Sequence, residues 1–164
     1  MRNFLLVVLL TVAAGGFIWW SKRQVPSNLQ TTPGSSAVSS VNVPLPTEED
    51  IIRTFFNLIN EHRIPEAVGM LSQESVPDNA AKQAWGVQFN ALNSVKVQKI
   101  EASNQNEWLE DRHVYKLTLE TSVSPLAANA PIPYYGWENG VNIRWVEIQK
   151  ENNLWKIVGL ATGP

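Results

Sequence analysis

The sequence predicts an α+β domain in which three N-terminal helices pack on a curved antiparallel sheet of four or more strands. Up to Asn93, apolar residues recur at helical spacing. Beyond Asn93, apolar and polar residues alternate, which is typical of strands with one buried face. Because the helices precede the strands instead of alternating with them, the order indicates an α+β fold.

Ahead of this domain, residues 4–20 form an uncharged, apolar stretch. Its length is typical of a short transmembrane helix, and Trp19 and Trp20 beside basic residues resemble an interfacial belt. Small residues within the stretch also fit a signal-peptide cleavage point. We therefore expect residues 1–23 to be a signal-anchor that crosses the cell membrane once, and a cleaved, secreted form is the alternative.

Residues 24–46 hold four prolines, many serines and threonines, and no charge. Such a segment cannot bury enough apolar surface to fold, so it is expected to be a flexible linker. The folded domain is expected over residues 47–164, on the extracytoplasmic side of the membrane. The basic residues on both sides of the apolar stretch leave that orientation open.

The first helix is expected to begin at "PTEED", with Thr47 as its N-cap and acidic residues in its first turn. The acidic residues 48–50 complement the helix dipole and do not by themselves indicate a cation site. A second, short helix is expected at "PEAVGMLS" and a third at "DNAAKQAWGVQFNAL". Trp85 and Phe89 lie on one stripe of the third helix, which is typical of core packing.

Four strands are expected, at "SVKVQKIEA", "HVYKLTLETSV", "VNIRWVEIQK" and "LWKIVGLAT". In the third strand the apolar phase slips at Trp145 and Val146, which predicts a β-bulge. The fourth strand is apolar on both faces, which is typical of a strand inside a sheet. From this alternation, the residues expected near the core are Tyr115, Leu117, Leu119, Ile143, Trp145, Trp155 and Ile157.

The opening helix "EEDIIRTFFNLINEHRIPEAVGMLS" and the final hairpin "RWVEIQKENNLWKIVGLATGP" resemble the nuclear transport factor 2-like, or cystatin-like, cone superfamily. The resemblance covers residues 47–164, with Trp155, Lys156 and Ile157 at the usual close of such domains. It implies a cone-shaped sheet around an apolar pocket. The order of membrane segment, linker and domain is similar to bacterial membrane-anchored members of unknown function and to inner-membrane scaffold subunits of type IV secretion systems.

The resemblance also implies a pocket in which the superfamily's enzymes place an acid or base, where burial tunes its pKa. Here the expected pocket walls are Tyr115, Trp145 and Trp155, and Tyr115 is the one titratable residue among those expected near the core. His113 follows Asp111 at a spacing that fits a dyad, but their position favours a solvated turn. We therefore expect no catalytic residue, although the sequence alone does not decide whether the protein is an enzyme.

The composition excludes several kinds of function. The chain has no cysteine, which rules out disulfides, thiol nucleophiles and cysteine-ligated metals. His62 and His113 lie far apart without a metal-binding spacing, so neither a metal nor a cofactor is expected. From Glu48 onward the chain carries fifteen acidic and ten basic residues, a net charge of −5. This acidic balance argues against nucleic acid as a partner.

Residues 131–140, "PIPYYGWENG", place Tyr134, Tyr135 and Trp137 in the long connection between the second and third strands. Aromatic rings in a loop give rigid contact area for a protein partner or for stacking on a cell-wall glycan. Long loops in compact domains are usually functional or disordered, and these rings argue against disorder. The loop can equally fold across the open end of the sheet as a lid and bury its rings. The sequence does not decide between a contact surface and a lid.

The leading hypothesis is a non-catalytic, membrane-anchored extracytoplasmic domain that acts by protein–protein contact as an envelope scaffold or assembly component. The three loop aromatics are its candidate contact residues, and the outer face of the sheet is a candidate homodimer interface. The alternative is a small-molecule binder or enzyme that uses the cone pocket. A carboxylate or histidine buried in that pocket would favour the alternative.

Overall fold

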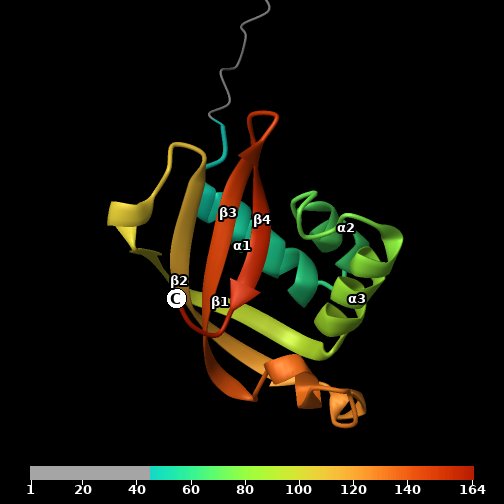
Figure 1. Ribbon diagram of the computed structural model, residues 1–164. Helices are drawn as coiled ribbons and strands as arrows, with labels where there is room; N and C mark the ends of the chain where they lie inside the picture. The colour runs from blue at the N-terminus through green and yellow to red at the C-terminus, as the bar shows by residue number, and fades with distance from the viewer. Residues whose placement is uncertain (1–44) are drawn as a thin grey trace, which may run out of the picture. The chain divides into compact units, whose positions relative to one another are not determined.

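Figure 1 shows the computed structural model, which describes residues 45–164 as part of one compact unit. Three helices come first, α1 (Glu48–Asn60), α2 (Ile64–Gly69) and α3 (Asn79–Asn90). Four strands follow, β1 (Leu92–Ser103), β2 (Arg112–Val123), β3 (Gly140–Glu151) and β4 (Leu154–Ala161). The connections contain short 3-10 helices, η1 (Gln105–Glu107), η2 (Pro125–Ala127) and η3 (Pro133–Gly136). The α+β class and the order of elements predicted from the sequence are confirmed.

The predicted membrane segment, residues 4–20, and residues 24–44 of the predicted linker lie outside the described residues. Within residues 45–164, no helix is long and apolar enough to cross a bilayer. The signal-anchor and the linker therefore stay predictions from the sequence.

Helix α1 begins where the sequence predicts. The Thr47 hydroxyl accepts a hydrogen bond from the backbone N–H of Asp50 at 3.2 Å, and the Asp50 carboxylate accepts one from the backbone N–H of Thr47 at 2.9 Å. This reciprocal capping fixes the direction of the first turn. The helix then buries one apolar face, formed by Ile52, Phe55, Phe56, Leu58 and Ile59.

The strands form one antiparallel sheet in the order β1-β2-β3-β4. Figure 1 shows this sheet strongly curved, with α1 across one face and α2 and α3 beside it. Phe89 of α3 meets Phe55 of α1 edge to face at 5.4 Å between ring centroids, so the helices and the sheet share one core. Trp85 stacks on Phe89, and its indole N–H donates to the Ser75 carbonyl at 3.1 Å, which fits the predicted core packing.

Strand β2 follows the predicted alternation, because its odd-numbered residues from Tyr115 to Val123 are buried and the residues between them are more exposed. Strand β3 does not follow the prediction. Its pairing with β2 runs without a shift along its length, so the bulge predicted at Trp145 and Val146 is wrong. The shift lies instead in the pairing of β3 with β4, where Val158 has no partner.

In the first half of β3, the buried face is therefore the one opposite to the face that the sequence predicts. Asn142 and Arg144 point toward the core and are buried, whereas Ile143 and Trp145 lie half-buried on the outer face of the sheet. The expectation that Ile143 and Trp145 lie near the core is wrong. The inward polar side chains hold the 124–140 connection by hydrogen bonds, which compensates their burial.

Strand β4 lies at an edge of the sheet, so its predicted interior position is also wrong. The segment after α2 covers part of that edge. The N–H of Ile157 donates to the Met70 carbonyl at 3.0 Å, and the N–H of Ser72 donates to the Ile157 carbonyl at 2.8 Å. This added contact pairs part of the otherwise open edge of β4.

Candidate functional site

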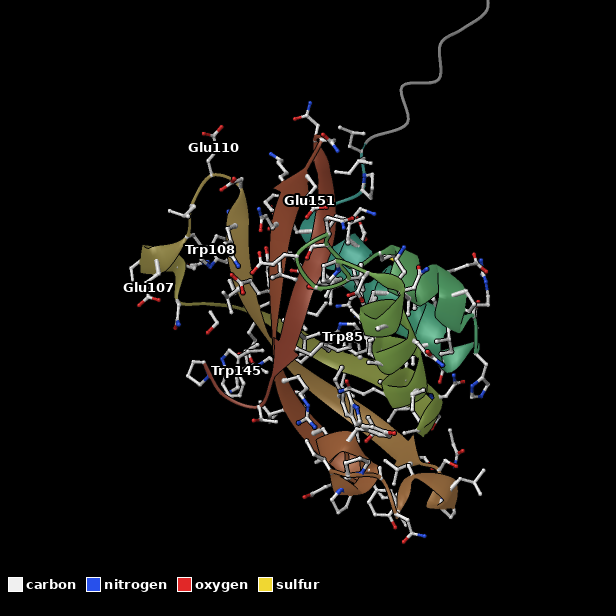
Figure 2. All side chains as sticks on the ribbon, turned by 45° about the vertical axis from the view of Figure 1, so that its right-hand side comes forward. Trp85, Glu107, Trp108, Glu110, Trp145 and Glu151 are labelled. Atoms are coloured by element: carbon white, nitrogen blue, oxygen red, sulfur yellow. The ribbon has the colours of Figure 1, made fainter. Side chains whose placement is uncertain are left out.

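A groove of about 620 Å³ opens beside the first turn of α1. Four of its walls come from different parts of the chain: Glu48 from α1, Trp108 from the turn after η1, Tyr115 from β2 and Trp155 from β4. Figure 2 shows Trp108 within the turn between β1 and β2, while Glu107 and Glu110 of the same turn point outward. The groove therefore combines the acidic first turn of α1 with three aromatic rings, and we call it the Glu48 groove.

The Glu48 carboxylate is held by two side chains of β2. Its Oε2 atom accepts a hydrogen bond from the Tyr115 hydroxyl at 2.5 Å and lies 2.7 Å from Nδ1 of His113. Because a carboxylate can only accept hydrogen bonds, Nδ1 of His113 is the donor in this pair. The other oxygen, Oε1, has no hydrogen-bond partner among residues 45–164. The carboxylate thus keeps one oxygen free while the other fixes its position.

Aromatic rings surround this hydrogen-bonded group. The His113 ring stacks on Trp108, with ring centroids 4.1 Å apart, and meets Trp155 at 5.0 Å. Trp108 also lies 5.4 Å from Tyr115, and its indole N–H donates to the Ser103 carbonyl at 2.8 Å. His113 itself is not a wall of the groove. His113 holds Glu48 through Nδ1, and the indole rings of Trp108 and Trp155 pack against the His113 ring.

The hydrogen-bonded His113 and Glu48 side chains are largely buried, with exposed fractions of 15% and 22%. Burial is also the main reason that the pKa of Tyr115 lies well above its ordinary value. The hydrogen bond to Glu48 and the negative charges of Glu48 and Glu49 raise that pKa further. Tyr115 therefore remains protonated at neutral pH and acts as a hydrogen-bond donor.

The neighbouring carboxylates of α1 are engaged elsewhere. Glu49 pairs with Arg53 at 3.8 Å, and Asp50 is used in the helix cap, where hydrogen bonds from Thr47 lower the pKa of Asp50. Glu48 forms no ion pair with a lysine or arginine in the part of the chain that the structure describes. Of the three acidic residues at the start of α1, Glu48 is the one whose carboxylate is held by side chains of β2.

Two of the three predicted pocket walls meet in the Glu48 groove, and the third does not. Tyr115 and Trp155 line it, whereas Trp145 lies on the other face of the sheet. The register explains this difference, because Trp145 pairs with Lys116 and not with Tyr115. The Lys116 ammonium lies 5.6 Å from the centroid of the Trp145 ring. Figure 2 shows Trp145 well apart from Trp108.

Sequence reasoning missed Glu48, Trp108 and His113. His113 was expected in a solvated turn, yet it precedes Tyr115 by two residues on one strand, which places both on the same face. That spacing is a signal in the sequence. Glu48 gave no such signal, because its helix-start position explains an acidic residue without any tertiary contact.

The aromatic loop lies at a different part of the sheet, below the strands in the view of Figure 1. Trp137 is 2% exposed, and the guanidinium of Arg144 lies 4.3 Å from the centroid of its ring. Tyr134 and Tyr135 are half-buried against the core, with left-handed backbone φ angles of 52° and 53°. Trp137 therefore serves as a cover of the core, and the most exposed apolar side chain of the connection is Leu126.

Among the described residues, no group of three or more His, Asp or Glu side chains is arranged to hold a metal ion. No known protein-family model matches the chain, and no curated protein is significantly similar to it.

Proposed function

We propose that residues 47–164 form a binding domain that holds a small molecule in the Glu48 groove. One observation carries this proposal: Tyr115 and His113 fix Oε2 of Glu48, Oε1 accepts no hydrogen bond from residues 45–164, and Glu48 lines the groove together with three aromatic residues. Small-molecule sites commonly combine apolar and aromatic walls with a few well-placed polar groups. A carboxylate in the pocket is also one of the two features that would favour the second sequence hypothesis, a small-molecule binder.

The proposed role is binding without catalysis. The raised pKa of Tyr115 keeps its hydroxyl protonated, so this residue is not a general base. His113 uses Nδ1 to hold Glu48 and does not line the groove. Of Glu48, His113 and Tyr115, the residue left to act on a ligand is Glu48. Its fixed position suits recognition of a ligand group.

The proposed setting is the cell envelope. Residues 4–20 would anchor the protein in the membrane, residues 24–46 would form the linker, and the folded domain would be extracytoplasmic, or secreted after cleavage. Pro46 is itself a wall of the Glu48 groove, so the linker would join the domain at the rim of the binding site. Membership of the cone superfamily is part of this proposal, supported by the resemblance of residues 47–164.

The proposed binding can be tested on the full chain labelled with 5-fluorotryptophan. The protein has seven tryptophans, each of which gives one fluorine signal that a Trp→Phe variant assigns. In a screen of small fragments, ligands should shift the signals of Trp108 and Trp155 and leave that of Trp145 unchanged. The proposal is wrong if bound fragments consistently shift Trp145 or other tryptophans and spare the two groove residues.

A second candidate function is protein–protein contact through the 124–140 connection, which the sequence hypothesis places first. The supporting observation is that Leu126 and Ile132 are 93% and 63% exposed. Leu126 also borders a depression of about 290 Å³ with Tyr135 and Val87. Exposed apolar side chains beside a hollow are typical of contact surfaces.

A photo-crosslinking amino acid tests this contact in living cells. Placed at position 126, it should give one discrete protein adduct, whereas the same group at exposed position 66 on α2 should give none. Equal labelling from Leu126 and Glu66 would contradict a specific surface on the loop.

A further inference from the structure

We infer that the Glu48 groove recognises an organic cation, namely an ammonium group on a small molecule. This inference rests on the proposed function and names the chemical class of its ligand. Three features of the groove support it: a free carboxylate oxygen, aromatic ring faces, and a local charge balance that disfavours anions.

The first feature is the free oxygen of Glu48. Oε2 accepts hydrogen bonds from two side chains, and Oε1 accepts none from the described residues. A charge-assisted hydrogen bond from an ammonium N–H to such an oxygen is stronger than one between neutral groups. Because Tyr115 and His113 hold the carboxylate in place, little conformational freedom is lost when a ligand binds.

The second feature is the set of aromatic rings that line the groove together with Glu48. Trp108, Tyr115 and Trp155 line the groove, and the face of an aromatic ring attracts a cation within about 6 Å. The chain already uses one of these rings in this way, since the Lys150 ammonium lies 5.0 Å from the centroid of the Trp155 ring. An ammonium group is therefore compatible with the surroundings of Trp155.

The third feature is charge. The walls of the groove include three carboxylates, those of residues 48–50, and one guanidinium, that of Arg53. Arg53 lies 3.8 Å from Glu49, which offsets part of its positive charge. The helix dipole alone would favour an anion at this end of α1, but the cap already engages the N–H groups of Thr47 and Asp50 and places the Asp50 carboxylate there. The remaining field of the carboxylates favours a cation.

The test uses the full chain and three small probes of matched size: butylammonium, butanol and butyrate. Dissociation constants come from the fluorine shifts of Trp108 and Trp155. Butylammonium should bind at least about tenfold more tightly than butanol, and butyrate should be the weakest of the three. Equal or tighter binding of butanol or butyrate at the groove would overturn the cation inference and leave the proposed groove in place.

Three variants separate recognition from damage to the fold. Glu48→Gln should weaken butylammonium binding about tenfold, whereas Glu110→Gln, an exposed carboxylate that does not line the groove, should change it less than about twofold. Lys150→Met should strengthen binding about threefold, because it removes a competing cation near Trp155. A damaged fold cannot produce that gain. Equal effects of the two glutamine variants, or weaker binding in Lys150→Met, would contradict the inference.

Discussion

The guanidinium of Arg144 lies 4.3 Å from the centroid of the Trp137 ring, and both side chains are buried. Arg144 also donates hydrogen bonds to the backbone carbonyls of Ile143 and Gly136, so it joins β3 to the 124–140 connection. Burial lowers the pKa of Arg144, while Glu138 offsets part of that effect, and the guanidinium remains charged at neutral pH. A cation and an indole together therefore fix this connection on the core.

Replacing Trp137 with alanine tests its role as a cover. The substitution should lower the free energy of unfolding by about 3–5 kcal/mol, because it removes a fully buried indole. Chemical denaturation followed by circular dichroism measures the change. The matched control is Leu126→Ala on the same connection, which should change the free energy by less than about 0.5 kcal/mol because Leu126 is exposed. Similar effects of the two substitutions would show that Trp137 is not a cover.

The contact between Arg144 and Trp137 can be measured by a double-mutant cycle. Trp137→Leu and Arg144→Met each keep an apolar side chain of substantial volume, so the cycle isolates the attraction between cation and ring. The coupling free energy should be about 1 kcal/mol or more, since the pair is desolvated. A coupling near zero would mean that the two residues stabilise the loop independently.

Tyr115 should make stability depend on alkaline pH. Its folded-state pKa is raised above the ordinary tyrosine value, so its contribution is complete below that value and is lost as pH rises through the folded-state pKa. The free-energy difference between wild type and Tyr115→Phe should therefore shrink above about pH 10. Denaturation curves at several pH values measure this free-energy difference. The Tyr134→Phe variant, measured in the same way, is the control. A difference that grows with rising pH would contradict the hydrogen bond from Tyr115 to Glu48.

At neutral pH, Tyr115→Phe should itself lower the free energy of unfolding by about 1–3 kcal/mol, because it leaves Oε2 of Glu48 without one of its two donors. It should also weaken ligand binding in the groove, since the carboxylate then loses part of its fixed position. Trp145→Phe, on the outer face of the sheet, is the control for binding and should leave the dissociation constant unchanged. Weaker binding in Trp145→Phe would mean that the ligand does not occupy the proposed groove.

Local patterns were enough to predict most of the elements. The cap at Thr47 and the alternation from Tyr115 to Val123 depend on residues close together in sequence, and both are confirmed. The phase of β3 could not be predicted in this way. Asn142 and Arg144 can face the core because the 124–140 connection supplies their hydrogen-bond partners, and that contact is tertiary.

The groove was predicted only in part for a similar reason. Tyr115 and Trp155 were expected at a pocket from their strand pattern. Glu48 could not be predicted there, because its partner His113 lies 65 residues away in the sequence. Their contact depends on how α1 crosses the sheet. Acidic residues at a helix start are common, so the sequence offered a sufficient local explanation for Glu48.

The most direct test of the central claim is a crystal structure of the protein with bound butylammonium. We expect the ligand nitrogen within about 2.7–3.2 Å of Oε1 of Glu48, and within about 6 Å of a ring centroid of Trp108, Tyr115 or Trp155. Oε2 should keep its hydrogen bonds to Tyr115 and His113. A ligand bound elsewhere, or an Oε1 atom occupied by a protein donor, would contradict the account.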